Sequence, residues 1–247
     1  MIKKIIFKNI VFNNFKFSDF NKVISKKGYF TFPSGPGLSS IKISVKYHVS
    51  LQKSDLVFFD SGLFVILLRF FKGIKVNKFS GYKFVELFLK YIKKNNRKVI
   101  LCIDPNFKYS RNNKILLNEL GVKKVYNYIA PKYNPKNIKD FKLVNLINKT
   151  KPDFILNNIG GGTQEILGLY LKEKIKYKTT IICTGAAISF FTGDQAPILK
   201  IIDKFYLGWL TRIIFKPQIF LLRYINSFKL FFMVKKSKIT VRYKKFS

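Results

Sequence analysis

Residues 154–187, FILNNIGGGTQEILGLYLKEKIKYKTTIICTGAA, carry one pattern twice, an apolar run followed by glycine and then by a helical segment. The first run, Phe154–Ile159, leads into three consecutive glycines, and a helix is expected to begin at Gln164. The second run, Thr180–Cys183, leads into Gly185. Glycine lets the backbone approach a ligand closely, and a helix amino terminus offers free N–H groups and the positive end of a dipole. Two such turns predict a ligand site at the carboxyl ends of parallel strands.

The remaining sequence also favours an α/β protein, because apolar runs and helical patterns alternate along it. Further strands are expected at Ile2–Phe12, Tyr29–Phe32, Leu56–Phe59, Lys98–Ile103 and Lys124–Tyr128, and helices at Phe84–Lys94, Asn113–Leu120, Gln164–Lys174 and Pro197–Phe205. We therefore predict an α/β, Rossmann-like, mostly parallel sheet flanked by helices, in one domain over residues 1–197.

The composition changes after residue 197, where twelve Lys and Arg residues and one acid, Asp203, lie among many Phe, Leu and Ile residues. Arg212, Lys216 and Arg223 would share one stripe of a helix, and Pro217 would divide the segment into two helices. A basic and apolar helical pair fits the interface with an anionic membrane. The alternative is an ordinary packed terminal helix with a basic solvent face. The prediction is a basic amphipathic helical appendage over residues 198–247.

The net charge of the chain is +35, from 47 Lys and Arg against 12 Asp and Glu. Such a charge favours a polyanionic partner such as nucleic acid, an anionic bilayer or a pyrophosphate substrate. Coding bias is the alternative, because Lys, Asn, Ile, Phe and Tyr are abundant together. Hydrophobic residues make up 48% of the chain, which argues against a disordered protein.

The residue types needed for several catalytic and metal sites are scarce. His48 is the only histidine, which argues against a His-centred triad or a multi-His metal site. Cys102 and Cys183 lie in apolar runs and are expected to be buried thiols, too few for a zinc site. The amino-terminal residues show no signal-peptide pattern. No apolar stretch reaches the length of about 18 residues that a membrane span requires.

An ordered set of motifs in residues 159–224 resembles the WecG/TagA/CpsF family of glycosyltransferases. The set is a strand, a Gly-x-Gln-Glu turn, a Gly-Ala-Ala turn, an Ala-Pro step and a Trp-Leu-x-Arg segment. Residues 53–62 (KSDLVFFDSG), 29–34 (YFTFPS) and 79–82 (FSGY) resemble further elements of that family. The resemblance therefore spans residues 25–228.

The resemblance implies a metal-independent, inverting transfer of a sugar, N-acetylmannosamine in the type cases, from UDP to an undecaprenyl-diphosphate-linked sugar in surface-polysaccharide assembly. Such a reaction needs a base for the acceptor hydroxyl group. With one histidine, that base should be a carboxylate, and Asp60, Asp104, Glu165 and Asp194 all lie at strand or turn ends. Asp60 matches the proposed catalytic carboxylate of the family and is our candidate. An aspartate that only closes a turn or caps a helix is the alternative.

The remaining site residues are assigned from the glycine turns and the resemblance. The expected substrate contacts are Thr31, Ser34, Gly81, Tyr82, Gly160, Gly161, Gln164, Glu165 and Gly185. The glycine turn could instead be a plain connector, and Glu165 could only cap its helix. Arg212, Lys216 and Arg223 are expected to contact the lipid diphosphate or the membrane. The resemblance implies the diphosphate contact for Arg212 and Arg223, which match arginines of the family, and guanidinium forks suit that group.

Several positions depart from the family pattern, namely Ser61, Ser189, Gln195 and Gly208, so the donor stays open. The expected partners are a UDP-sugar, a polyprenyl-diphosphate-linked acceptor and an anionic membrane, with no cofactor; a homo-oligomer stays open. The expected location is the cytoplasmic face of the plasma membrane, as a peripheral protein. Two alternatives are a basic nucleic-acid-binding protein and an inactive protein that binds sugar nucleotides. No nucleic-acid-binding motif occurs, which argues against the former.

Overall fold

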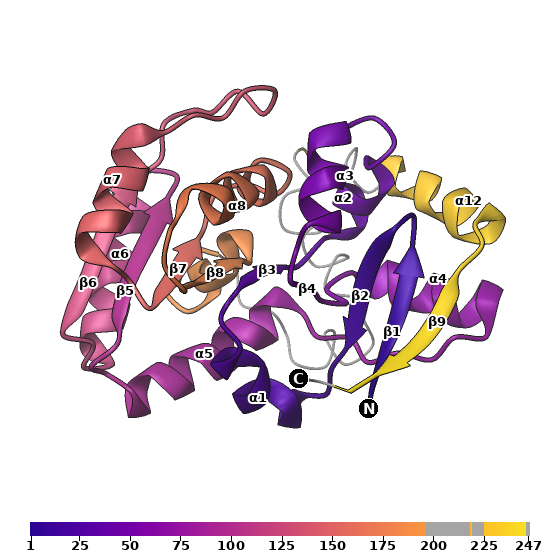
Figure 1. The fold of residues 1–247 in the computed structure, drawn as a ribbon, viewed down its shortest axis with the longest axis horizontal. Coiled ribbons are helices and arrows are strands. Elements are labelled where there is room, and N and C mark those ends of the chain that lie inside the picture. The colour runs from indigo at the N-terminus through magenta and orange to yellow at the C-terminus, as the bar shows by residue number, and fades with distance from the viewer. Residues whose placement is uncertain (196–217, 219–224, 246–247) are drawn as a thin grey trace.

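One mixed sheet organises the computed structural model, which describes residues 1–195, 218 and 225–245 (Figure 1). Its nine strands within these residues lie in the order β6-β5-β7-β8-β3-β4-β2-β1-β9. The strands are β1 (Ile2–Phe7), β2 (Ile10–Asn14), β3 (Tyr29–Thr31), β4 (Leu56–Val57), β5 (Val99–Asp104), β6 (Lys124–Ile129), β7 (Phe154–Asn157), β8 (Thr180–Cys183) and β9 (Thr240–Lys244). Neighbours from β6 to β2 are parallel, whereas β1 pairs antiparallel with β2 and β9.

Helices cover both faces of the sheet, which confirms the predicted α/β, Rossmann-like fold. They are α1 (Phe20–Ser25), α2 (Gly35–Ser39), α3 (Val45–Gln52), α4 (Gly62–Lys72), α5 (Gly81–Lys94), α6 (Phe107–Glu119), α7 (Phe141–Thr150), α8 (Thr163–Lys174) and α12 (Lys229–Lys236), with 3-10 turns η1 (Phe17–Asp19), η2 (Gly185–Phe190) and η3 (Asn226–Phe228).

Alternation along the strands builds two cores, one on each face of the sheet. Leu101 and Ile103 of β5 belong to the core that includes residues of α4, α7, α8 and α12, whereas Ile100 and Cys102 belong to the core that includes residues of α1, α5 and α6. Successive side chains of a strand point to opposite faces, so both faces of a central strand can be apolar. Both cysteines are buried free thiols, as predicted.

The expected single strand Ile2–Phe12 is wrong, because the structure divides it into the hairpin β1–β2. Phe7 pairs with Ile10, which leaves a two-residue turn at Lys8 and Asn9. Both turn residues have positive φ angles, 49° and 61°. A two-residue hairpin turn of the right twist needs positive φ at both positions, and Asn tolerates it better than most residues.

The last described residues are built into the fold beside the amino terminus. Strand β9 pairs with β1 at the edge of the sheet, and α12 packs on α4 through Phe231, whose ring lies 4.6 Å from that of Phe71. The predicted appendage 198–247 therefore contains a strand as well as a helix in its described part. The predicted boundary at residue 197, the helix Pro197–Phe205 and the two-helix division at Pro217 lie outside the described residues.

Candidate active site

A cavity of about 620 Å³ opens at the carboxyl ends of the central strands. Loops and helix ends that follow β3, β4, β7 and β8 line it, so residues distant in the sequence share one space. Of the expected site residues, the lining includes Ser34, Asp60, Gly81, Tyr82, Gly160, Gly161, Gln164, Glu165 and Gly185. The structure thus brings together nearly all the predicted donor and acceptor contacts that it describes.

The two glycine turns form the floor of this cavity. Gly162 has a φ angle of 91° and Gly185 one of 60°, a left-handed conformation that glycine adopts without strain. A Cβ atom built on Gly160 or Gly161 would meet no atom within 4 Å, so these residues face open space. Helix α8 begins directly after them, and the positive end of its dipole favours an anion at this end.

Gln164 and Glu165 connect the two turns through buried hydrogen bonds. The Gly162 N–H donates to Glu165 Oε2 at 2.7 Å, and Gln164 Nε2 donates to Glu165 Oε1 at 3.0 Å. The Gly185 N–H in turn donates to Gln164 Oε1 at 2.6 Å. Glu165 therefore does cap α8, as the alternative had it, and it also lines the cavity.

Burial raises the pKa of Glu165 to about 7, and the negative charge of Asp60 acts in the same direction. The hydrogen bonds from Gly162 and Gln164 oppose this rise, because they stabilise the carboxylate. The residue is 1% exposed. A carboxyl group with this pKa exchanges its proton near neutral pH.

Asp60 lies at the end of β4 and is only partly buried. Its Oδ1 accepts a hydrogen bond from the Gly81 N–H at 2.8 Å, at the amino terminus of α5. The helix that follows Asp60, α4, is capped by Ser61, whose Oγ accepts from the Phe64 N–H at 3.2 Å. Asp60 therefore binds the amino terminus of α5, in keeping with the alternative of a helix-end role, and it also lines the cavity.

Other expected contacts also have structural roles at the cavity wall. Ser34 caps α2 through a hydrogen bond from the Gly37 N–H, 3.3 Å long. Tyr82 stacks on Phe191 with ring centroids 5.1 Å apart and planes 9° apart. At Gly81, a Cβ atom would lie 3.3 Å from Thr184, so glycine lets α5 approach the turn after β8.

Four expected residues are not placed in the cavity. Thr31 is fully buried in β3 and donates a hydrogen bond to Ser54 Oγ at 3.0 Å, so it does not line the cavity. Arg212, Lys216 and Arg223 lie outside the described residues.

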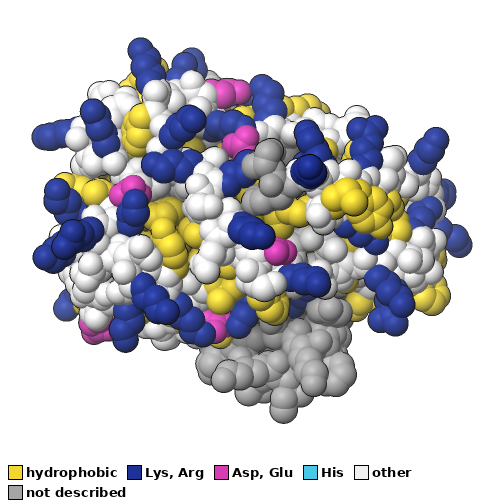
Figure 2. Space-filling model, turned by 60° about the horizontal axis from the view of Figure 1, so that its bottom comes forward, with side chains coloured by type: hydrophobic (Ala, Val, Ile, Leu, Met, Phe, Trp, Pro, Cys, Tyr) yellow, Lys and Arg dark blue, Asp and Glu magenta, His cyan; other side chains and the backbone are white. Residues whose placement is uncertain are grey.

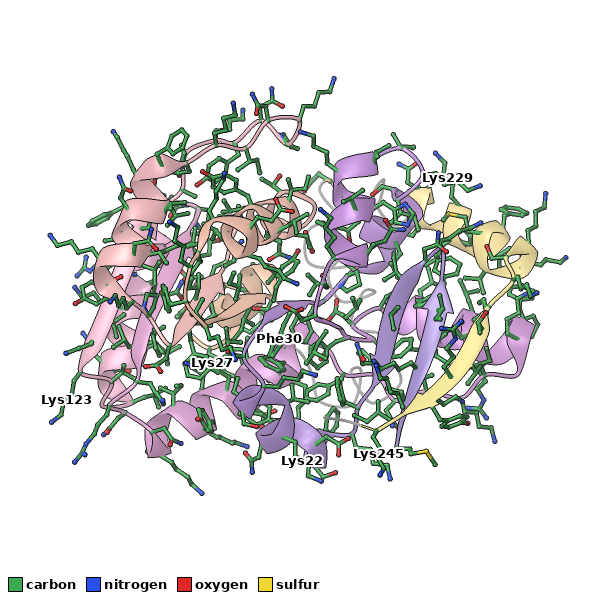
Figure 3. All side chains as sticks on the ribbon, in the orientation of Figure 1. Lys22, Lys27, Phe30, Lys123, Lys229 and Lys245 are labelled. Atoms are coloured by element: carbon green, nitrogen blue, oxygen red, sulfur yellow. The ribbon has the colours of Figure 1, made fainter. Side chains whose placement is uncertain are left out.

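Sequence reasoning missed several lining residues, among them Tyr47, Asn226 and Lys229. Tyr47 lies on α3, a helix that the apolar pattern did not reveal, and its pKa is raised by burial. Lys229 begins α12 beside α2 and is far in the sequence from most of the other lining residues (Figure 3). The Ser-Gly-Pro-Gly run after β3, in which Ser34 caps a helix, was the signal for a turn at this place.

The other candidate carboxylates stabilise the fold outside this cavity. Asp104 is fully buried and accepts hydrogen bonds from Asn113 and Asn158, both 2.7 Å long; burial raises its pKa. Asp55, expected to be structural, binds the Tyr29 N–H at 2.8 Å and Lys172 at 2.8 Å. Asp194 pairs with Lys108, and its hydrogen bonds and this charge lower its pKa.

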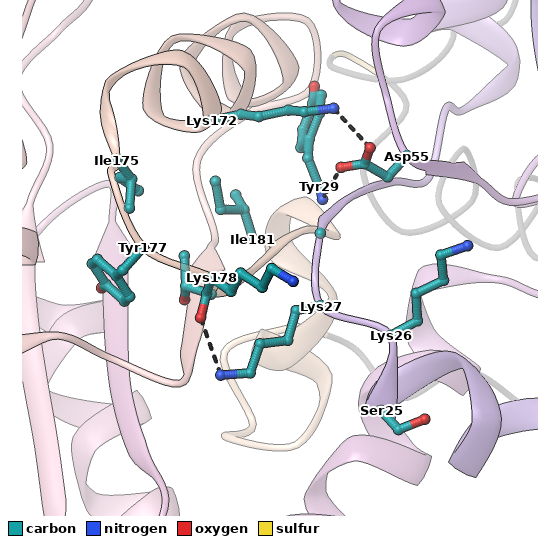
Figure 4. Close-up of a pocket in the computed structure, with 12 residues that line it drawn as sticks. Ser25, Lys26, Lys27, Tyr29, Asp55, Lys172, Ile175, Tyr177, Lys178 and Ile181 are labelled. Carbon is teal, nitrogen blue, oxygen red and sulfur yellow. Dashed lines mark hydrogen bonds and ion pairs between the residues drawn. The ribbon is translucent and has the colours of Figure 1, made fainter. Parts of the chain in front are cut away.

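A second cavity, of about 540 Å³, lies at the opposite, amino-terminal edge of the strands (Figure 4). Two of its four lining lysines make internal contacts, since Lys172 pairs with Asp55 and Lys27 donates to the Lys178 carbonyl oxygen at 3.0 Å. Helices α1 and α8 end here, so their dipoles present negative ends that these lysines offset.

Within residues 1–195 and 225–245, His, Cys, Asp and Glu side chains do not gather in groups of three that could hold a metal ion. Nor does any helix in the described ranges combine the length and apolar character needed to cross a bilayer.

The family resemblance inferred from the motifs can be tested by matching family models to the whole chain. A family model described as the glycosyl transferase WecG/TagA/CpsF family matches residues 6–244. No curated protein matches the chain. The match includes both glycine turns, Asp60 and the described carboxyl-terminal elements, and it extends beyond the resemblance seen in residues 25–228. The chain therefore belongs to the WecG/TagA/CpsF family of glycosyltransferases.

Proposed function

We propose that this glycosyltransferase inverts the anomeric centre as it moves a sugar of the N-acetylmannosamine type from UDP to an undecaprenyl-diphosphate-linked sugar. The observation that supports this proposal is the shared cavity of Asp60 and the two glycine turns. A base and an anion-binding floor are the two groups that such a transfer requires.

In the proposed reaction, Asp60 takes the proton of the acceptor hydroxyl group as its oxygen attacks the anomeric carbon. The bond from that carbon to the diphosphate oxygen breaks, and UDP leaves with the bonding electrons. The Gly81 N–H orients the Asp60 carboxylate through its 2.8 Å hydrogen bond. The amino terminus of α8, with the positive end of its dipole, lies beside the expected position of the diphosphate and stabilises its growing charge. No metal or other cofactor enters this scheme.

Peripheral binding to an anionic membrane, at its cytoplasmic face, forms part of the proposal. Ile43, at the cavity wall, is largely exposed, and η3 and α12 also expose Phe228 and Phe232 at 70% and 59%. Lys229 lines the same cavity, and Lys235 and Lys236 end the helix. Aromatic side chains with lysines beside them suit a headgroup layer. A lipid-linked acceptor held in that layer would meet the cavity from this side.

The decisive experiment offers purified protein a panel of UDP-sugars with an undecaprenyl-diphosphate-linked sugar and measures UDP release. We expect one UDP-sugar to give acceptor-dependent release and a product with inverted anomeric configuration. Binding of UDP without turnover for any donor would favour the inactive sugar-nucleotide-binding alternative. A retained anomeric configuration would exclude the single displacement by which Asp60 is proposed to act.

A further inference from the structure

Glu165 lies buried in the cavity floor, although its carboxyl group can carry a charge. Its two oxygens accept hydrogen bonds from the Gly162 N–H, 2.7 Å long, and from Gln164 Nε2, 3.0 Å long. In the described part of the chain, no Lys or Arg forms an ion pair with it. A buried carboxylate without a cation is costly, and it gains a proton more readily than an exposed one.

The hydrogen bonds around Glu165 have only one possible direction. The Gly185 N–H can only donate, so the oxygen of Gln164 faces it at 2.6 Å and the amide NH₂ of Gln164 faces Glu165. Glu165 must accept from both Gln164 and Gly162. The turn after β7 and the turn after β8 are therefore held together by this pair of side chains, and both turns line the cavity.

Among the described residues, the groups that interact with Glu165 from neighbouring elements are acidic or neutral, and Lys229, the lysine on the wall of this cavity, forms no ion pair with it. Asp60, after β4, raises the pKa of Glu165 through its negative charge. Tyr47 on α3, Tyr29 on β3 and Cys183 on β8 have pKa values raised by burial, so they are neutral near pH 7. Tyr29 donates its hydroxyl hydrogen to the backbone oxygen of Glu165 at 2.6 Å. A diphosphate entering this cavity would add further negative charge.

We propose that Glu165 is a positioning residue that holds the two glycine turns together and takes up one proton from solvent when a nucleoside diphosphate occupies the cavity. The proton joins one carboxyl oxygen and returns to solvent when the nucleotide leaves. A neutral carboxyl group keeps acceptor capacity for its N–H donors while losing its charge. This inference rests on the proposed binding of UDP.

The linkage between proton uptake and UDP binding sets the direction in which UDP affinity changes with pH. Free Glu165, with its pKa at about 7, is part ionised at neutral pH. A bound diphosphate raises that pKa further. At a pH between the pKa of the free protein and that of the complex, Glu165 therefore gains a proton on binding. UDP affinity therefore falls as pH rises above about 7, and the fall ends once both states are ionised. The expected uptake is about half a proton per UDP at neutral pH, by the Henderson–Hasselbalch relation.

Calorimetry with UDP, repeated in two buffers of different ionisation enthalpy, measures this uptake directly. The wild-type protein should take up a proton beyond the amount that the ionisation of UDP itself accounts for. Glu165→Gln should lose this excess. Glu173→Gln removes an exposed carboxylate from the same helix, and the excess should persist in that control. UDP ionisation is common to all three proteins and cancels in the comparison.

A second measurement covers the case in which Glu165→Gln does not fold. The chain has four glutamates, Glu86, Glu119, Glu165 and Glu173, so carbon-13 labelling of glutamate carboxyl groups gives four NMR signals. One signal should titrate near pH 7 in the free protein and at higher pH with UDP bound. UDP binding without excess proton uptake, or without such a signal, overturns the role of Glu165 and leaves the donor proposal standing. A wild-type protein that binds no UDP overturns the donor proposal itself.

Discussion

Two carboxylates share the cavity, and their surroundings differ. Asp60 is partly exposed and accepts a hydrogen bond from the Gly81 N–H, whereas Glu165 is buried and accepts hydrogen bonds from Gly162 and Gln164. A carboxylate that meets the acceptor can act as a base, and one enclosed beneath the glycine turns can hold them in place. The environment of each group, more than its residue type, divides the two roles.

Asp60→Asn should lower kcat by about 10²–10⁴-fold with little change in folding, because general-base catalysis supplies a factor of this size. The amide oxygen of Asn can still accept the Gly81 N–H, so the hydrogen bond at the end of β4 survives. UDP release with the lipid-linked acceptor measures kcat, and circular dichroism checks the fold. Near-normal turnover by the folded variant would remove Asp60 from the mechanism.

Replacing Gly160 and Gly161 together by Val should abolish UDP binding while changing thermal stability little. Side chains at these positions enter open space above the cavity floor, where the diphosphate is expected. Neither residue has the left-handed φ that makes Gly162 intolerant of a side chain. Calorimetry measures the affinity for UDP, and a thermal melt measures the stability of the double variant. An unchanged affinity in the folded double variant would make the triple glycine a plain connector.

At the scale of elements, the sequence revealed the helices and strands whose apolar residues recur with a clear period. It missed those that are buried by a partner distant in the sequence. The strand Thr180–Cys183 and the helix predicted at Gln164–Lys174 correspond closely to β8 and α8. Helix α4, GLFVILLRFFK, was missed because apolar residues lie on most of its sides. One of these sides is covered by α12, which arrives from the other end of the chain.

One leucine substitution and one phenylalanine substitution on α12 should distinguish the side of the helix that stabilises the fold from the side that is exposed. Leu230 is fully buried, so Leu230→Ala should lower the free energy of unfolding by about 2–5 kcal/mol. Phe232 is largely exposed, so Phe232→Ala should change it by less than about 0.5 kcal/mol. Urea unfolding measures both. Equal effects of the two changes would contradict the packing of α12 into the domain.

At the scale of the whole molecule, the charge of +35 is spread over the surface. On the described part of the face shown in Figure 2, Lys and Arg side chains are widely spread and Asp and Glu are few. A positive field of this extent attracts any anionic surface. It cannot by itself select one face for the proposed membrane contact, so in that proposal the exposed aromatic residues near the cavity provide the selection.

The protein should sediment with phosphatidylglycerol liposomes, weakly with phosphatidylcholine liposomes, and be only partly released by high salt. Salt screens the lysine attraction within a Debye length of about 10 Å at 0.1 M, but it does not screen the burial of aromatic side chains. Phe228→Ala with Phe232→Ala should reduce the salt-resistant fraction. Phe107→Ala with Phe141→Ala, at 70% and 68% exposed on α6 and α7, is the matched control. Equal losses in both pairs would contradict a membrane face at α12.

Point substitutions are preferable to a truncation near residue 200. Such a truncation would remove β9, which pairs with β1, and α12, whose Leu230 and Val234 are fully buried. A loss of membrane binding would then reflect unfolding as much as a missing surface. The roles expected for Arg212 and Arg223 are therefore better tested by charge reversal in the full chain.

The sequence by itself determined the glycine turns, the alternating strands and Asp60 at a strand end, because these features depend on neighbours within a few residues. Local patterns also gave the α/β fold and the family resemblance. Only the tertiary structure decided that Thr31 is enclosed in the sheet, that Lys229 joins the cavity wall and that β9 pairs with β1. It alone also decided the burial that raises the pKa of Glu165 to about 7. Burial and long-range pairing come from the whole packed chain, and no local pattern records them.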